Sequence, residues 1–202
     1  MFRMTPHQFL LLHNILVHRY GLQGGNLVST EEAVGIFLWT VRGSESNRQA
    51  QNKFPHSGSI ISLYFRRVLN RVYNLGVDNI RPRDPTFQGV HPRMTCPQFS
   101  PWFDGCIGAM DGTHIPIQVT PSKNLPYIGR EGLPTLNFVA VCDHDARFIF
   151  TCAKEGTLHD ATVFQEAIEE YGDRFPHPPE GIRQETKTLC FDHHMCYAEL
   201  TC

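Results

Sequence analysis

The segment Cys106–Ile117, which reads CIGAMDGTHIPI, constrains the fold of this chain more than any other stretch. Its β-branched residues favour a strand, namely Ile107, Ile115 and Ile117. Gly108 and Gly112 leave room for another group to approach the backbone. Asp111 then lies in the middle of an apolar strand, where a carboxylate is costly to bury unless it is paired or binds a cation. The alternative is a tight turn, because Asp-Gly is a common turn dipeptide.

Two further blocks follow this segment, NFVAVCD at Asn137–Asp143 and GTLHD at Gly156–Asp160. Together with the GAMDGTHI of Gly108–Ile115, in which Met110 stands where the family pattern has Ile, they resemble the Harbinger/PIF transposase-derived nucleases of the DDE superfamily endonucleases. The blocks occur in the family's order, and the resemblance covers most of the chain. It implies an RNase H-like fold and metal-dependent hydrolysis of DNA.

Composition and charge are those of a globular protein with unlike halves. The 202 residues are 41% hydrophobic and 19% charged, and no apolar run is long enough to cross a membrane. Residues 1–95 carry a net charge of +6 and residues 96–202 a net charge of −8. A basic first half suits nucleic acid and an acidic second half suits cations, although chance clustering is the alternative. The seven cysteines form no disulfide pattern, which predicts a reduced, intracellular protein, nuclear if it acts on genomic DNA.

Residues 1–80 are predicted to be all-helical. Thr5 with Gln8 and Ser29 with Glu32 are predicted capping boxes, and a long helix is expected from Ser59 to just before Gly76. This last helix follows a short polar segment and a turn, an order that resembles helix-turn-helix proteins. Three of its residues are predicted to contact DNA phosphates, namely Arg66, Arg67 and Arg71. The alternative is a helical bundle with a solvated arginine face.

Residues 81–101 are rich in proline and are predicted to link the helical region to a second domain at residues 102–202. That domain is expected to contain strands at 107–119, 137–142 and 147–153, a helix from Asp160, and a fourth strand at 187–191 that ends at Asp192. The predicted fold class is therefore α/β, with an N-terminal helix-turn-helix-like region followed by an incomplete RNase H-like mixed sheet.

In the fold that the resemblance implies, the first and fourth strands are neighbours, so that Asp111 and Asp192 would meet. Carboxylates are the ligands that Mg²⁺ and Mn²⁺ prefer, and two such ions can promote phosphodiester hydrolysis. Asp160 is a candidate third catalytic and metal-binding carboxylate. Its alternative role is the N-cap of the helix that follows, a common use of Asp.

The resemblance ends at Asp192, and the distant glutamate of the family has no counterpart in residues 193–202. We therefore expect a truncated, catalytically incomplete member of the family. The alternative is a domesticated, non-enzymatic protein that binds double-stranded DNA or a chromatin partner, with a separate DNA-binding protein as a candidate partner. Four residues near the end are zinc-ligand types without a standard spacing, namely Cys190, His193, His194 and Cys196.

Overall fold

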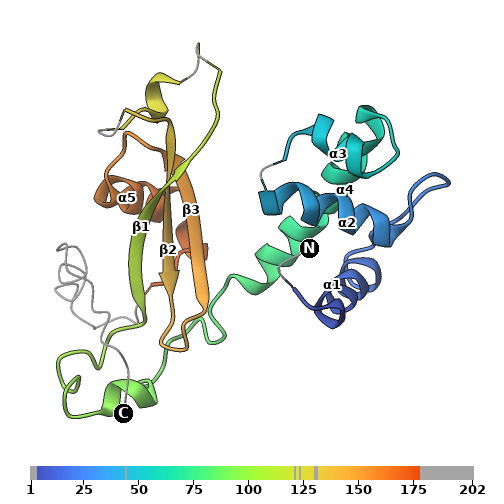
Figure 1. The fold of residues 1–202 in the computed structure, drawn as a ribbon. Coiled ribbons are helices and arrows are strands. Elements are labelled where there is room, and N and C mark those ends of the chain that lie inside the picture. The colour runs from blue at the N-terminus through green and yellow to red at the C-terminus, as the bar shows by residue number, and fades with distance from the viewer. Residues whose placement is uncertain (1–3, 44, 121, 123, 130–131, 178–202) are drawn as a thin grey trace. The chain divides into compact units, whose positions relative to one another are not determined.

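The computed structural model describes residues 4–43, 45–120, 122, 124–129 and 132–177. The chain divides into two compact units, Met1–Asn79 and Ile80–Cys202. The first unit contains helices and the second a sheet with a covering helix (Figure 1). Each unit has its own hydrophobic core.

The first unit contains the helices α1 (Pro6–His18), α2 (Thr30–Gly43), α3 (Asn47–Lys53) and α4 (Gly58–Asn79). The predicted capping box of α1 forms, because Thr5 Oγ1 accepts a hydrogen bond from Gln8 N at 3.2 Å and Gln8 Oε1 accepts one from Thr5 N at 2.8 Å. The short polar segment after α2 is also a helix, α3, which begins with a capping box of its own.

The box predicted at the start of α2 is only half formed. Ser29 Oγ accepts a hydrogen bond from Glu32 N at 3.1 Å. The Glu32 carboxylate, however, lies 3.0 Å from His56 Nε2, in the segment before α4. A tertiary contact thus replaces the local bond that would complete the box.

The core of the first unit joins α1, α2 and α4. Leu16, Ile36 and Val68 have no exposed surface, and the rings of Phe37 and Phe65 pack with centroids 5.4 Å apart. Burying one such aliphatic side chain contributes roughly 1.5–3 kcal/mol. Because short isolated helices are marginal in water, this packing stabilises the helices more than their intrinsic propensity does.

The helix α4 continues past Gly76, where the sequence predicted its end. Its last turn is bonded to the two residues that follow α1, since Arg19 Nη2 and the Tyr20 hydroxyl donate to Asp78 Oδ2 at 3.1 and 2.7 Å. Asn79 Nδ2 also donates to the carbonyl oxygen of Leu75 at 2.7 Å. These bonds outweigh the cost of about 1 kcal/mol for a glycine inside a helix.

The second unit contains an antiparallel sheet in the order β1–β2–β3, with β1 at Ala109–Pro116, β2 at Thr135–Cys142 and β3 at Phe148–Glu155. The helix α5 (Asp160–Tyr171) crosses one face of this sheet (Figure 1). Three short 3₁₀ helices complete the described elements, η1 (Pro92–Thr95), η3 (Leu125–Tyr127) and η4 (Gly172–Arg174). Among the described strands β1 pairs only with β2, so its other edge carries no strand.

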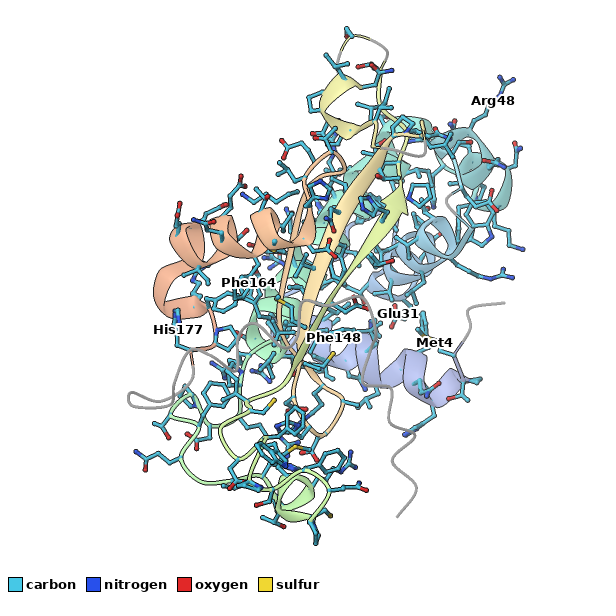
Figure 2. All side chains as sticks on the ribbon, turned by 90° about the vertical axis from the view of Figure 1, so that its left-hand side faces the viewer. Met4, Glu31, Arg48, Phe148, Phe164 and His177 are labelled. Atoms are coloured by element: carbon cyan, nitrogen blue, oxygen red, sulfur yellow. The ribbon has the colours of Figure 1, made fainter. Side chains whose placement is uncertain are left out.

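Alternation along the strands determines which face α5 covers. Val139 and Val141 of β2 are buried with Val163 and Ala167 of α5, while the β2 residues between them are partly exposed. Aromatic rings close this core at the end of α5. Phe164, a residue of α5 that is labelled in Figure 2, packs edge-on against Phe175 at a centroid distance of 5.4 Å.

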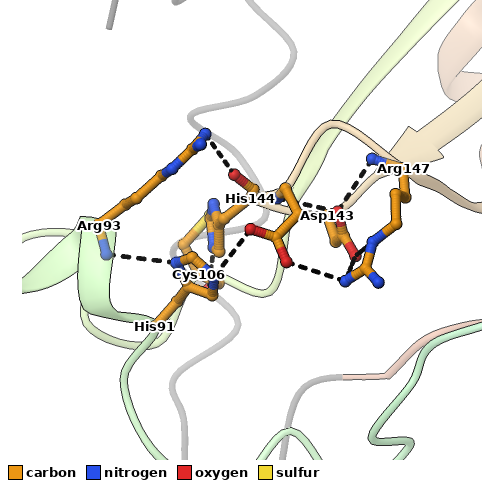
Figure 3. A network of polar contacts seen from close by, with 7 residues as sticks. His91, Arg93, Cys106, Asp143, His144 and Arg147 are labelled. Carbon is orange, nitrogen blue, oxygen red and sulfur yellow. Dashed lines mark hydrogen bonds and ion pairs between the residues drawn. The ribbon is translucent and has the colours of Figure 1, made fainter.

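A polar network surrounds the turn between β2 and β3 (Figure 3). Arg147 Nη2 lies 2.8 Å from Asp143 Oδ2 and 3.0 Å from Asp145 Oδ2. Burial alone would raise the pKa of Asp143, but hydrogen bonds from Arg147 and from the Asp145 amide together hold it below its usual value. The network also binds the segment before β1, because Arg93 Nη1 donates to the carbonyl oxygen of His144 at 2.8 Å.

The predicted α/β fold class is confirmed: a helical region is followed by three strands and a helix in the predicted order. Asp111 and Gly112 lie inside β1, so the alternative of a tight turn there is wrong. The fourth strand predicted at 187–191 lies outside the described residues. None of the described helices is both long and apolar enough to span a membrane.

Replacing Gly76 with alanine should stabilise the first unit, because a Cβ at this helical position meets no atom within 4 Å. We expect a gain of about 0.5–1 kcal/mol, or a rise of a few degrees in Tm, measured by circular dichroism at 222 nm. Gly21→Ala is the matched control, since its site is equally open but its φ is +64°. That variant should lose about 1 kcal/mol, and equal effects of the two changes would contradict this account.

Limited trypsin digestion should locate the boundary between the units. We propose that the connection is most accessible at residues 81–86, since Phe87 packs on the second core and Arg93 is bonded to the β2–β3 turn. Arg81 precedes a proline, which trypsin does not cleave efficiently, so the first cut between the units should follow Arg83. Mass spectrometry of the early fragments tests this, and earlier cleavage within α4 would argue against the boundary.

Candidate active site

Asp111 lies in the middle of β1, opposite Ala140 of β2. Its side chain is exposed, and Oδ1 accepts a hydrogen bond from the backbone N of Gly112 at 2.9 Å. It forms no ion pair with any residue that the structure describes. Asp111 is thus a carboxylate fixed within a strand, with most of its oxygen lone pairs directed to solvent.

Gly112 allows Asp160 to approach the sheet. A Cβ at residue 112 would lie 2.5 Å from the Asp160 Cγ, which no real side chain tolerates. The carboxylate of Asp160 therefore rests directly on the backbone of β1. The glycine of the first block and the aspartate of the third block, separated in the sequence, meet because only glycine fits at this point.

Asn137 completes this contact and was missed by the sequence reasoning. Its side chain is fully buried in the middle of β2, where Nδ2 donates to Asp160 Oδ1 at 2.7 Å and to the carbonyl oxygen of Leu158 at 2.9 Å. Its Oδ1 has no hydrogen-bond partner among the described residues. The signal in the sequence was an amide at an inward position of an otherwise apolar strand, which needs an internal partner.

Asp160 does not cap α5 in the predicted way. It is the first residue of the helix, and the N-cap position belongs to His159. The alternative role as N-cap is therefore wrong, although a carboxylate in the first turn still interacts favourably with the helix dipole. The main contact of Asp160 is instead the hydrogen bond from Asn137.

The structure does not bring Asp111 and Asp160 together on one face. Asp160 lies over Gly112, and successive residues of a strand project to opposite faces. The side chain of Asp111 therefore leaves from the face that α5 does not cover. Asp192, the predicted partner of Asp111, lies outside the described residues, as do Cys190, His193, His194 and Cys196.

Other polar residues near the site have internal partners. His114 Nδ1 lies 3.0 Å from Thr135 Oγ1. Lys154 is bound by Glu170 and Glu166 of α5, and the hydrogen bond to Glu170 raises the pKa of that lysine. Among the described residues, no group of three or more His, Cys, Asp or Glu side chains is placed to hold a metal ion.

The arginines predicted to contact DNA lie on α4 in the first unit. Arg66 and Arg67 are exposed and Arg71 is partly exposed. The guanidinium of Arg67 stacks over the ring of Tyr64, 4.9 Å from the centroid. No acidic residue occurs in α4 before Asp78, and that residue is bonded to Arg19 and Tyr20 of the first unit.

Comparison with known proteins agrees with the blocks of the sequence. Residues 110–175 match the DDE superfamily endonucleases, and residues 1–74 match a domain of unknown function (DUF8040). The chain is 36% identical over 64 residues to "Putative nuclease HARBI1" of Rattus norvegicus. It is 34% identical over 64 residues to the protein of the same name from Bos taurus.

Each of these alignments covers 31% of this chain and 18% of the relative, so it spans about a fifth of the relatives' length. No solved structure matches the chain. The family match contains Asp111, Asn137 and Asp160, the residues on and around β1 described above. Residues 110–175 thus match the DDE superfamily endonucleases, and the resemblance to transposase-derived nucleases is confirmed.

Proposed function

We propose that the second unit is part of a divalent-metal-dependent endonuclease that hydrolyses DNA, and that Asp111 is its first metal ligand. The observation that carries this proposal is the state of Asp111: it is exposed at mid-strand and forms no ion pair with a described residue. Other acidic residues of the same unit are engaged by cations, for example Asp143 by Arg147 and Glu170 by Lys154. A strand carboxylate left without an internal cation is suited to an external one.

The described residues do not by themselves form a metal centre. Mg²⁺ requires near-octahedral oxygen coordination and loses its bound water reluctantly. Of the predicted metal ligands that the structure describes, only Asp111 lies on the exposed face of the sheet. A bound ion would activate water and stabilise the leaving oxygen. We propose that Asp192 is the second ligand and that Asp160, on the other face, positions the backbone of β1. We also propose that the 202-residue chain is catalytically incomplete.

The purified chain should bind Mn²⁺ weakly and should nick supercoiled plasmid poorly. Binding should be lost in Asp111→Asn, which keeps the size of the side chain and removes its charge. Electron paramagnetic resonance of free Mn²⁺ measures the binding, and gel electrophoresis measures the nicking. Glu155→Gln is the matched control, because it removes one charge from the end of β3 and should leave Mn²⁺ binding unchanged.

Two results would contradict this proposal in different ways. Mn²⁺ binding that survives Asp111→Asn would place the metal elsewhere. Efficient nicking that Asp111→Asn abolishes would support the metal role of Asp111, but it would overturn the proposed incompleteness.

A second candidate function is non-enzymatic binding of double-stranded DNA by the first unit. It is favoured by α4, which carries three arginines and no acidic residue before Asp78. Asp78 adds little negative potential, because Arg19 and Tyr20 bind its carboxylate. Such a protein would act in the nucleus, alone or beside a separate DNA-binding protein. The two functions share DNA as their target and differ in whether the DNA is cut.

Replacing Arg66, Arg67 and Arg71 together with alanine should weaken binding to any duplex. Each phosphate contact contributes about 0.9 to the slope of log K against log salt, so the loss of two or three contacts should make the slope shallower by about 2 to 3. Fluorescence anisotropy at several salt concentrations measures both effects. A control triple variant, Arg42→Ala with Arg83→Ala and Arg174→Ala, removes the same charge from exposed positions outside α4. An equal loss in both variants would show that net charge alone matters.

A further inference from the structure

We propose that α4 is a base-contacting helix. Its outward side, formed by Arg66, Asn70 and Asn74, would enter the major groove of double-stranded DNA, while Arg67 and Arg71 contact the phosphates beside it. This inference rests on the proposed DNA binding by the first unit. It adds that the binding prefers a particular sequence of bases.

The spacing of these residues places them on one side of the helix. Arg66, Asn70 and Asn74 recur every four residues, close to the 3.6 residues of one turn, and all three are exposed. The other side of α4 faces the core, where Ile61 and Val68 are buried. The outward side is therefore a continuous polar row that no described element of the first unit covers.

Arg67 and Arg71 lie beside this row and not within it. Arg67 follows Arg66 and Arg71 follows Asn70, and a step of one residue turns each of them by about 100° around the helix axis. Arg67 is also held in place by its contact with the Tyr64 ring at 4.9 Å. A central row with arginines along one flank suits a helix that lies in a groove, where the flank meets the phosphate backbone.

The chemistry of the row matches base edges. Asparagine can bond bidentately to the N6 and N7 atoms of adenine, and arginine can bond to the O6 and N7 atoms of guanine. Exposed apolar side chains lie beside the row or beyond its ends on the outward side of α4 and could contact thymine methyl groups, namely Leu63, Tyr73 and Val77, which are 44%, 68% and 52% exposed. The absence of any acidic residue from Gly58 to Val77 favours DNA over a basic protein partner.

The preceding helix supports the start of α4. Asn47 Nδ2, in α3, donates to the carbonyl oxygen of Gly58 at 2.9 Å and also to Ser62 Oγ. These bonds join the two helices through the short turn between Lys53 and Gly58. The first turn of α4 is thus bonded to α3 through Gly58 and Ser62, neither of which belongs to the outward row.

The length of the row sets the size of the expected site. Eight residues separate Arg66 from Asn74, which at 1.5 Å per residue is about 12 Å. One base pair occupies about 3.4 Å along the duplex, so the row can contact three or four consecutive base pairs. Adenine is expected at the positions that Asn70 and Asn74 contact.

The test is selection of preferred duplexes from a randomised pool by the full chain, followed by sequencing. The wild-type chain should select a preference of three or four adjacent base pairs that include adenine. Asn70→Ala and Asn74→Ala should each relax the preference at one of these positions and weaken binding to the selected duplex by about fivefold or more. Their binding to unrelated duplexes and its salt dependence should not change.

Asn52→Ala is the matched control, because Asn52 is an exposed asparagine of the same unit but lies on α3. It should leave the selected sequence unchanged. Exposed asparagines can be replaced without loss of the fold, so circular dichroism of each variant should match the wild type. Binding to DNA without a base preference, or with a preference that both variants retain, would overturn the base-contacting role and leave the proposed DNA binding intact. No binding at low salt would overturn both.

Discussion

The hydrogen bond between Asn137 and Asp160 is the contact on which the arrangement of the second unit depends. It joins the middle of β2 to the first residue of α5, and it brings the Asp160 carboxylate onto the backbone of β1 at Gly112. The buried amide of Asn137 would be costly to leave unpaired, and the exposed carboxylate of Asp160 provides the acceptor for its N–H group. One polar contact thus connects β2 and α5 and places Asp160 against β1, the strand that carries Asp111 on its other face.

The acidic residues of the second unit differ in the groups that contact their carboxylates. Those near the β2–β3 turn neutralise Arg147, and those on α5 neutralise Lys154. Asp160 accepts a hydrogen bond from the neutral amide of Asn137, so it keeps its negative charge. That charge interacts favourably with the dipole at the start of α5. Asp111 differs from all of these, because its described contact is the amide of the next residue. A single backbone amide does not neutralise a carboxylate, so no described residue compensates the negative charge of Asp111.

Local patterns predicted much of the fold, and the errors arose where distant residues decide the outcome. Capping predicted the start of α1 and β-branched residues predicted β1, because these features depend on neighbours in the sequence. The predicted end of α4 was wrong because Asp78 is bonded to Arg19 and Tyr20, which follow α1. The partner of Asn137 was not predictable, because Asp160 lies 23 residues away in the sequence. The position of Asp111 was predictable from its block, whereas the face from which Asp160 projects depends on the packing of α5 over Gly112.

The edge of β1 that faces away from β2 carries none of the described strands. The register of any strand that pairs there decides which of its side chains lie beside Asp111. A strand that joins this edge brings its side chains alternately to the two faces, so a shift of one residue exchanges the two sets completely. Only registers of one parity would place a carboxylate beside Asp111, about 5 Å away across the strands, and those of the other parity would place it on the side of α5. The register of a strand paired at this edge therefore decides whether its carboxylate lies beside Asp111 or on the face that α5 covers, without any change in sequence.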